Sequence, residues 1–337
     1  MQPKHILVFR FSSLGDIAMT VPVIRNLLQQ HPQLQVTFVS VAFVKPLFDN
    51  IERLHFVTAD LKGKHKKVAG LYRLYKELSA MNFYDAIADL HNVLRTQILR
   101  IFFSNKKIAA INKGRKEKKE LTRQHHKILT PLKSTFQRYA DVFNELGFPI
   151  ELQTEQGISK SKKDVGLEQT ELKKIGIAPF ARYTEKMYPL DKMQQVIRIL
   201  STSEKSQIIL FGGKEDAMLL QQIAQEHQNV ISVAGSISFK EELSLISQLD
   251  VMISMDSANM HLASLYGVPV VSVWGGTHPF LGFLGWGQSL NNCVQIDLEC
   301  RPSSVFGNKP CPNQLACMNG ISPLAIVEKV FAVLASE

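Results

Sequence analysis

The sequence lacks any apolar run long enough to cross a lipid bilayer, which takes about 20 residues. Residues 1–10 also lack the basic, apolar and small-residue regions of a signal peptide. Of the 337 residues, 45% are hydrophobic and 20% are charged, which is typical of a folded soluble chain and not of a disordered one. We therefore expect a cytoplasmic protein, and the length predicts two domains of ordinary size.

Cysteine is also scarce, and no two cysteines have the close spacing of a structural zinc site. The four cysteines are Cys293, Cys300, Cys311 and Cys317. Without a Cys-x-x-Cys pair the spacing gives zinc little support, and a cytosolic setting argues against disulfides. We interpret these residues as reduced thiols that order a loop. No group of histidines and carboxylates stands at metal-ligand spacing elsewhere, so we expect no metal site.

Acidic residues are few in the first half of the chain. Residues 1–150 hold 24 Lys and Arg against 11 Asp and Glu, a net +13, whereas the remainder holds 15 against 19, a net −4. Much of the excess lies in KGKHKK (62–67) and NKGRKEKKELTR (112–123). This favours an anionic membrane or a phosphorylated substrate as partner, with solvated basic loops as the alternative. Aromatic residues do not alternate with these charges, which disfavours nucleic acid.

What the sequence does have is a repeated alternation of apolar strands and amphipathic helices, the pattern of parallel, doubly wound sheets. Strands are predicted at 4–9, 34–41, within 81–91, and at 175–180, 207–211, 230–233, 250–254 and 268–274. Helices are predicted at 21–31, after residue 92, and at 189–202, 215–227, 239–248, 257–266 and 322–335. The last of these has a serine cap followed by proline.

The alternation stops in a polar stretch after Pro149 and then starts again. We predict an α/β protein with an N-terminal Rossmann-like domain (1–155), a linker (156–174) and a C-terminal Rossmann-like domain (175–337). The helix at 322–335 is a candidate to pack back on the first domain.

Ligands of open parallel sheets bind at the carboxyl ends of the strands, so two turns stand out. In FRFSSLGDIAMTVPVI (9–24) the first strand ends before Asp16. Aspartate is a favoured helix cap. However, Thr20 before Val21 and Pro22 offers a separate helix start, so we predict that the cap does not need Asp16. In the turn after 250–254, Asp256 or Ser257 could cap a helix whose amides suit a diphosphate.

Five segments, in order along the chain, resemble the ADP-heptose:lipopolysaccharide heptosyltransferases of glycosyltransferase family 9. They are ILVFRFSSLGDIAMTVPVIRNL, YDAIADLHNVLRT, GIAPFARYTEKMYPLDKM, ILFGGKED and DSANMHLASLYGVPVVSVWGGTHP. The resemblance implies a GT-B fold, two Rossmann-like domains facing a cleft. It also implies inverting, metal-independent transfer of a heptose from ADP-heptose, or of a related sugar from another nucleotide sugar, to a lipopolysaccharide core acceptor, without a cofactor.

The resemblance also assigns site residues. Asp16 matches the general base, Lys186 the lysine that contacts the donor phosphates, and Glu215 the acid that binds the ribose. The segment around the donor sugar and diphosphate matches Asp256, Ser257, Ala258, Asn259, His261 and Thr277. Ser257 and Ala258 stand where the family usually has threonine and glycine.

The family's acceptor is a phosphorylated lipid A–Kdo core at the inner membrane surface. The acceptor-binding candidates, chosen by location and not by motif, are Ser13, Arg95, Arg115, Lys119 and Arg123, with Lys113 and Lys118 beside them. A basic residue near anionic lipid contributes roughly 1 kcal/mol. We therefore expect peripheral contact with the cytoplasmic face of the inner membrane.

Three alternatives stay open from the sequence. A sugar-nucleotide 2-epimerase shares the GT-B architecture but has no need of a basic first half. A non-catalytic sugar-nucleotide or glycolipid-binding protein would be expected to lack Asp16, which is present. A nicotinamide-dependent oxidoreductase is disfavoured because no Gly-x-Gly-x-x-Gly follows a predicted strand.

Overall fold

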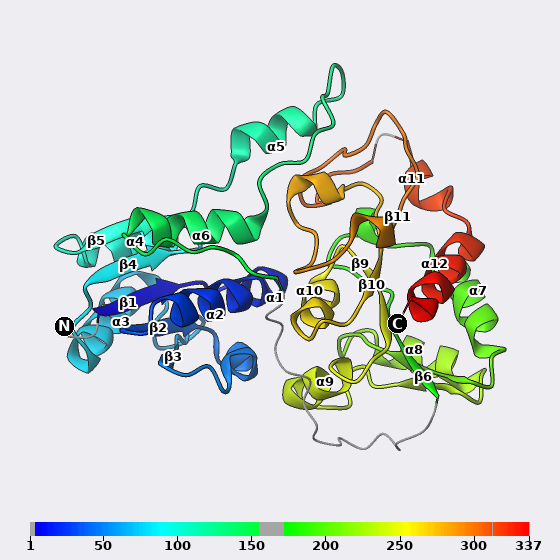
Figure 1. Ribbon diagram of the computed structural model, residues 1–337, viewed down its shortest axis with the longest axis horizontal. Helices are drawn as coiled ribbons and strands as arrows, with labels where there is room; N and C mark the ends of the chain where they lie inside the picture. The colour runs from blue at the N-terminus through cyan, green and yellow to red at the C-terminus, as the bar shows by residue number, and fades with distance from the viewer. Residues whose placement is uncertain (1–3, 155–171, 312, 337) are drawn as a thin grey trace. The chain divides into compact units, whose positions relative to one another are not determined.

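The computed structural model describes residues 4–154, 172–311 and 313–336 (Figure 1). Most of the predicted linker therefore lies outside the described residues. The chain divides into two compact units, Met1–Lys113 with Thr135–Gln156, and Gly114–Ser134 with Gly157–Glu337. This division differs from the predicted boundary at residues 114–134, which belong to the second unit although they lie within the first half of the chain.

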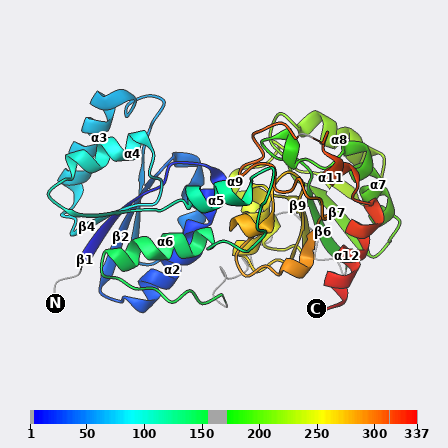
Figure 2. The same ribbon diagram turned by 90° about the horizontal axis from the view of Figure 1, so that it is seen from above.

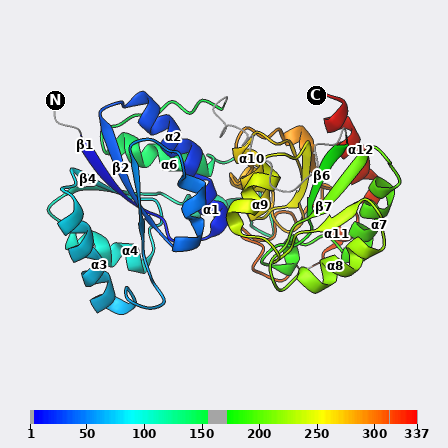
Figure 3. The same ribbon diagram turned by 90° about the horizontal axis from the view of Figure 1, so that it is seen from below.

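The first unit is a parallel five-stranded sheet in the order β3-β2-β1-β4-β5. Its strands are β1 (Lys4–Phe9), β2 (Leu34–Ser40), β3 (Leu54–Thr58), β4 (Ala86–Asp89) and β5 (Lys107–Ala110). Its helices are α1 (Leu14–Ala18), α2 (Thr20–Gln30), the 3-10 helix η1 (Ala42–Phe48), α3 (Lys67–Met81), α4 (Leu94–Phe102) and α6 (Thr135–Glu145). Helices α3 and α4 cover one face of the sheet, and α2 and α6 cover the other (Figures 2 and 3).

Burial on both faces explains why the central strand of this unit is continuously apolar. The last four residues of β1, from Ile6 to Phe9, are all 0% exposed, as expected for a parallel strand that is covered on both sides. Helix α3 meets the sheet through Leu71, Leu74 and Leu78, which lie on one helical face. Together with Leu7 and Phe9 they form part of one hydrophobic cluster.

The second unit contains a parallel six-stranded sheet in the order β11-β10-β9-β6-β7-β8. Its strands are β6 (Lys173–Ala178), β7 (Ser206–Leu210), β8 (Val230–Ser232), β9 (Val251–Met255), β10 (Val270–Val273) and β11 (Cys293–Val294). Its α-helices are α5 (Arg115–Leu121), α7 (Leu190–Ser201), α8 (Ala217–Gln225), α9 (Phe239–Ile246), α10 (Ala258–Leu265), α11 (Ala316–Asn319) and α12 (Pro323–Ala335). The 3-10 helices are η2 (Thr184–Lys186), η3 (Pro279–Leu281) and η4 (Leu290–Asn292).

The C-terminal helix begins as predicted and contributes to the core of the second unit. Ser322 caps α12 by accepting a hydrogen bond from the Leu324 amide at 3.3 Å. Its apolar face, including Ile326 and Val330, lies in the hydrophobic core of the second unit together with residues of α7 and β9. The buried face of this helix is therefore used within its own unit, and packing of the helix on the first domain stays a prediction.

Residues 114–134 are tied to the second unit by specific contacts. The Leu132 amide donates to the Phe280 carbonyl at 2.9 Å, and Lys127 Nζ donates to the Pro302 carbonyl at 3.2 Å. The Lys118 ammonium lies 4.0 Å from the centre of the Phe283 ring. These long-range contacts explain why sequence position alone misplaced the segment.

Both sheets reverse their strand order beside a central strand. In the first sheet the reversal lies between β1 and β4, where Phe9 is opposite Asp89. In the second it lies between β6 and β9, where Ala178 is opposite Ser254. Such a reversal leaves room for a ligand at the carboxyl ends of the strands, so the turns after these four strands are where a site is expected.

Candidate functional site

The turn after β1 leads directly into the short helix α1, which precedes α2. Ser13 is the N-cap of α1, and Asp16 is the third residue of that helix. The backbone amide and the hydroxyl of Ser13 both donate to Asp16 Oδ2, at 3.1 and 2.7 Å. This is the reciprocal half of a capping box. Asp16 thus takes part in the cap of α1, a helix that the sequence did not predict, whereas α2 begins at Thr20 without Asp16, as expected.

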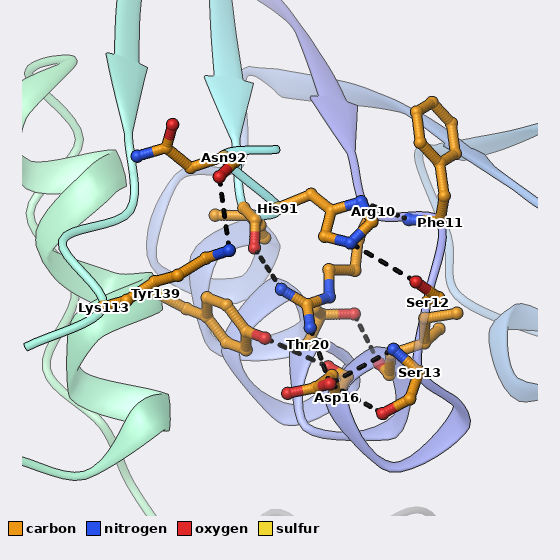
Figure 4. A network of polar contacts seen from close by, with 12 residues as sticks. Arg10, Phe11, Ser12, Ser13, Asp16, Thr20, His91, Asn92, Lys113 and Tyr139 are labelled. Atoms are coloured by element: carbon orange, nitrogen blue, oxygen red, sulfur yellow. Dashed lines mark hydrogen bonds and ion pairs between the residues drawn. The ribbon is translucent and has the colours of Figure 1, made fainter. Parts of the chain in front are cut away.

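A buried arginine gives Asp16 a second partner. Arg10 is 5% exposed, and its Nη2 lies 2.7 Å from Asp16 Oδ2 (Figure 4). Its Nη1 donates to the Leu90 carbonyl at 2.7 Å, on the turn after β4. Three donors thus converge on one carboxylate oxygen, while the side chain of Asp16 stays 29% exposed. The carboxylate is held in a fixed orientation and remains open to solvent.

Two further side chains complete this cluster. Tyr139 of α6 donates its hydroxyl to the Asp16 carbonyl at 3.2 Å, and burial raises the pKa of its phenol. Burial, together with the nearby Arg10 and Lys113 cations, lowers the pKa of His91 to about 3. His91 Nε2 lies 3.3 Å from Ser12 Oγ. At neutral pH His91 is therefore uncharged and supplies hydrogen bonds to the turn, not charge.

Sequence reasoning named Asp16 and Ser13 but missed Arg10, His91 and Tyr139. Arg10 had a usable signal, because a basic residue that directly follows an apolar strand of a parallel sheet stands at the ligand-binding edge. His91 likewise follows β4. Tyr139 had none, since it is 123 positions from Asp16 in the sequence.

The predicted acceptor residues fall in both units. Ser13 and Arg95, an exposed residue of α4, belong to the first unit. Arg115 and Lys119 are exposed on α5, in the second unit. Arg123 belongs to the same unit, and its Nη2 lies 3.9 Å from Glu120 Oε1. Their role at an acceptor stays a prediction.

In the second unit, the turns after β6, β9 and β10 meet at one carboxylate. Lys186 of η2 places its Nζ 2.7 Å from Asp256 Oδ2 and 3.2 Å from the Asp256 carbonyl. The Thr277 hydroxyl donates to the same Oδ2 at 2.8 Å. Asp256 is 5% exposed, whereas the side chain of Lys186 is 14% exposed. The structure thus brings three predicted donor residues together.

Helix α10 carries the other predicted donor residues at its start. Ser257 is the N-cap, and its hydroxyl lies 3.2 Å from Ser254 Oγ instead of bonding to a helix amide. Ala258 and Asn259 follow at the first turn, and His261 is buried one turn on. This N-terminus has eight helical residues behind it, so it presents a partial positive charge to an anion.

A small cavity of about 210 Å³ lies at the carboxyl ends of β7 and β8. Its lining includes Phe211, Gly212, Gly213, Lys214, Val233, Gly235, Ile237, Phe239 and Glu242. The predicted ribose ligand Glu215 is exposed on the same turn, next to Lys214. Burial raises the pKa of Glu242, which a hydrogen bond from Asn259 partly offsets. Glu242, which sequence reasoning missed, thus connects the cavity to the start of α10.

The cysteine-containing segment surrounds a buried arginine. Arg301 is 3% exposed and donates to the carbonyls of Gly275, Ile296 and Thr277. These bonds tie the segment to the turn that holds Thr277. Among residues 4–154, 172–311 and 313–336, no three His, Cys, Asp or Glu side chains gather as metal ligands. In the same ranges no helix is long and apolar enough to cross a membrane.

Two parallel sheets that reverse beside β1 and β6, with polar clusters at their carboxyl edges, match the GT-B fold of a solved heptosyltransferase. The model of glycosyltransferase family 9 (heptosyltransferase) matches residues 71–312, more than half of the chain. The chain therefore belongs to this family. Membership confirms the predicted family, fold class and enzyme type, and weighs against the epimerase, binding-protein and oxidoreductase alternatives.

The similarity to known relatives extends along most of this chain and most of each relative. The lipopolysaccharide core heptosyltransferase OpsX of Haemophilus influenzae is 23% identical over 286 residues, which cover 82% of this chain and 80% of the relative. Lipopolysaccharide heptosyltransferase 3 of Escherichia coli K12 is 26% identical, with 84% of both chains covered. The solved E. coli ADP-heptose lps heptosyltransferase II superposes with a TM-score of 0.71, at 17% identity and 99% coverage of each chain.

Proposed function

We propose that this enzyme transfers a heptose from ADP-heptose to the core of lipopolysaccharide, with inversion at the anomeric carbon. The observation that carries the proposal is Asp16, an oriented and partly exposed carboxylate at the switch point of the first sheet. Inversion needs one in-line displacement, in which a base accepts the proton of the acceptor hydroxyl as that oxygen attacks. The leaving group is the nucleoside diphosphate. Asp16 is the group we assign as base.

The second unit holds the donor in this proposal. The Lys186 ammonium and the N-terminus of α10 supply the positive charge that a departing diphosphate requires. Two of the N–H directions of Lys186 point at Asp256, and Asp256 is itself almost fully buried. We therefore assign Asp256 and Thr277 the task of positioning Lys186. The 210 Å³ cavity has room for a nucleobase, with Glu215 beside it for the ribose.

The remaining donor assignments follow from the start of α10. Ser257, Ala258, Asn259 and His261 would lie along the sugar and the diphosphate. With cationic groups of the chain at the diphosphate, the reaction as proposed needs neither a metal ion nor a cofactor. The acceptor would be a phosphorylated lipid A–Kdo core, met from the cytoplasmic side of the inner membrane by Ser13, Arg95, Arg115, Lys119 and Arg123.

The test replaces the proposed base without changing its size. Asp16→Asn is expected to lower kcat by at least about 100-fold, the low end of what a general base contributes, while ADP-heptose binds with nearly unchanged affinity. Asp49→Asn, which removes a partly exposed aspartate paired with Lys45 at 3.2 Å, is the matched control and should turn over normally. Near-normal turnover by Asp16→Asn would exclude the base assignment.

The donor and the stereochemistry are tested separately. ADP-, UDP- and GDP-sugars are compared by calorimetry, and the configuration of the product is read from its anomeric coupling constant in NMR. Binding of a UDP-sugar in place of ADP-heptose would reject the donor, and a retained configuration would reject the single displacement. Full activity in the presence of EDTA is expected, whereas loss of activity that Mg²⁺ restores would contradict metal independence.

A further inference from the structure

Helices α3 and α4, with the short segment that follows α3, leave a set of large apolar side chains in solvent. Phe83 is 74% exposed, Ile101 is 68%, Val68 is 57%, Met81 is 51% and Tyr72 is 47%. None of the five belongs to the candidate sites. The two helices lie side by side on the same face of the first sheet (Figures 2 and 3), so their outer surfaces form one side of this unit.

Contacts between neighbouring side chains show that part of this set is continuous. The Tyr72 ring of α3 packs edge-on against Phe102 of α4, with ring centres 5.4 Å apart, and Ile101 is the next residue. Ile101 and Lys106 line one open hollow of about 560 Å³. The Lys106 ammonium then lies 3.4 Å from the centre of the Phe83 ring. We call Tyr72, Phe83, Ile101 and Lys106 the α3–α4 face.

The surroundings of this face are basic. The Lys76 ammonium lies 5.7 Å from the centre of the Tyr72 ring, and Arg73 is exposed next to Tyr72 in the chain. Of the nearby acids, Glu77 is paired with Lys64 at 2.7 Å, Asp85 is exposed and accepts a hydrogen bond from the His5 amide at 2.8 Å, and Asp89 is fully buried. The surface therefore combines apolar side chains with an excess of positive charge.

We propose that the α3–α4 face docks on the surface of an anionic lipid bilayer. Phe83 and Ile101 would enter the headgroup layer, and the lysines around them would meet lipid phosphates. A second protein copy fits less well, because protein interfaces are depleted in lysine, whereas an anionic bilayer has charge complementary to it. Tyrosine and lysine both suit a boundary where one end is apolar and the other is in water.

The docking is a property beyond sugar transfer. It rests on the proposed function in one respect, because an enzyme that acts on a lipid-anchored acceptor has to reach the membrane surface. It differs from the expectation drawn from the basic runs, because it places the contact on a face that also carries apolar groups. Binding should therefore depend on both kinds of side chain and weaken as salt screens the charges.

The experiment measures cosedimentation of the full-length protein with vesicles of phosphatidylglycerol and phosphatidylethanolamine. The double variant Phe83→Ser/Ile101→Ser should bind at least about tenfold more weakly, since each exposed apolar side chain loses its burial in lipid. Lys106→Glu should weaken binding about fivefold or more, because one basic residue contributes about 1 kcal/mol. Vesicles of phosphatidylcholine alone should bind the protein poorly.

The matched control changes apolar residues of similar exposure in the second unit. Leu324 and Phe331 of α12 are 56% and 48% exposed, and Leu324→Ser/Phe331→Ser should bind vesicles like the unchanged protein. Equal binding by the Phe83→Ser/Ile101→Ser variant, or no vesicle binding by the unchanged protein, would overturn the proposal. So would light scattering that shows a dimer which this double variant dissolves.

A second readout separates docking from catalysis. Turnover of a water-soluble acceptor without its acyl chains should be the same in the unchanged protein and in the Phe83→Ser/Ile101→Ser variant, whereas turnover of the vesicle-bound acceptor should fall in the variant. If the unchanged protein fails on both acceptors while still binding vesicles, the proposed function fails and the docking stands. If the variant loses turnover of the soluble acceptor while keeping its melting temperature, the face acts in catalysis and the docking proposal is overturned.

Discussion

Arg10 joins two turns of the first sheet through a single guanidinium. One nitrogen contacts Asp16 at 2.7 Å and another contacts the Leu90 carbonyl at 2.7 Å, a geometry that a planar fork allows and an ammonium does not. Arg10→Gln should lower kcat about 10- to 100-fold, because the carboxylate loses its fixed orientation. The donor KM should change little, which steady-state kinetics will show.

The control for Arg10 is an arginine with the same kind of bonds elsewhere in the unit. Arg53 donates to the carbonyls of Leu28, His31, Pro32 and Leu34. Arg53→Gln should lower the melting temperature, since four backbone carbonyls lose their hydrogen bonds to the guanidinium, but leave kcat unchanged. A kcat that falls equally in both variants would mean that Arg10 acts only through stability.

The second prediction concerns Lys186, the residue proposed to contact the donor diphosphate. Lys186→Met should weaken ADP binding about 10- to 150-fold, the value of one charge-assisted hydrogen bond of about 1.5–3 kcal/mol. The same change leaves Asp256 buried without its cation, which destabilises the unit. Lys186→Met/Asp256→Asn removes that cost, so it should recover stability but not ADP affinity in calorimetry.

An ion pair outside the cluster tests specificity. Lys173 lies 3.1 Å from Asp250 in the same unit, and Lys173→Met should bind ADP normally. Recovery of ADP affinity in the Lys186→Met/Asp256→Asn variant would show that Lys186 serves only to neutralise Asp256.

At the scale of secondary-structure elements, helix α6 helps to fix the position of α1 through one hydrogen bond. The Tyr139 hydroxyl donates to the Asp16 carbonyl at 3.2 Å, and Tyr139 is 0% exposed. Tyr139→Phe should cost about 1 kcal/mol of stability and also reduce kcat, because α1 carries the proposed base. Tyr188→Phe, which removes a 2.8 Å bond from a tyrosine hydroxyl to the Ile321 carbonyl in the second unit, should cost similar stability and leave kcat unaltered.

The elements that sequence predicted are those with long, regular patterns. Strands β1, β2, β6, β7, β9 and β10 and helices α2, α7, α8, α9, α10 and α12 lie within a few residues of their predictions. Short β3 and β5, and helices α3, α5 and α6, were missed. Strand β5, KIAA, has only four residues and one buried side chain, and α5 is almost entirely charged, RKEKKEL. Tertiary contacts, not local pattern, fix such elements.

Some residues of the candidate sites could likewise be predicted from the sequence, and others could not. Asp16, Lys186 and Asp256 could be predicted because they follow strands within recognisable motifs. The α1 cap, the Arg10 fork and Tyr139 could not, because each depends on where a distant backbone group lies. The grouping of residues 114–134 with the second unit depends on contacts such as Leu132 to Phe280, which no local pattern records.

At the level of the whole molecule, each unit contains a buried histidine whose pKa is lowered by burial, and these two histidines predict how the protein responds to acid. Burial, with Arg10 and Lys113 nearby, lowers the pKa of His91 to about 3, and burial, with Arg301 nearby, lowers that of His278 to about 4. Both values lie below the ordinary 6.5. The unfolded chain therefore binds more protons than the folded chain between about pH 6.5 and 4, so stability falls as the pH falls through this window.

Each histidine should contribute up to about 1.4 kcal/mol per pH unit to the acid loss of stability. Denaturant unfolding between pH 7.5 and about pH 4 will show the slope, and His91→Gln should flatten it for the first unit and His278→Asn for the second. His125, an exposed histidine, is the control, and His125→Gln should leave the slope unchanged. If both buried-histidine variants lose stability in acid as steeply as the unchanged protein, other groups drive the acid unfolding, and His91 and His278 do not need to be neutral for the fold.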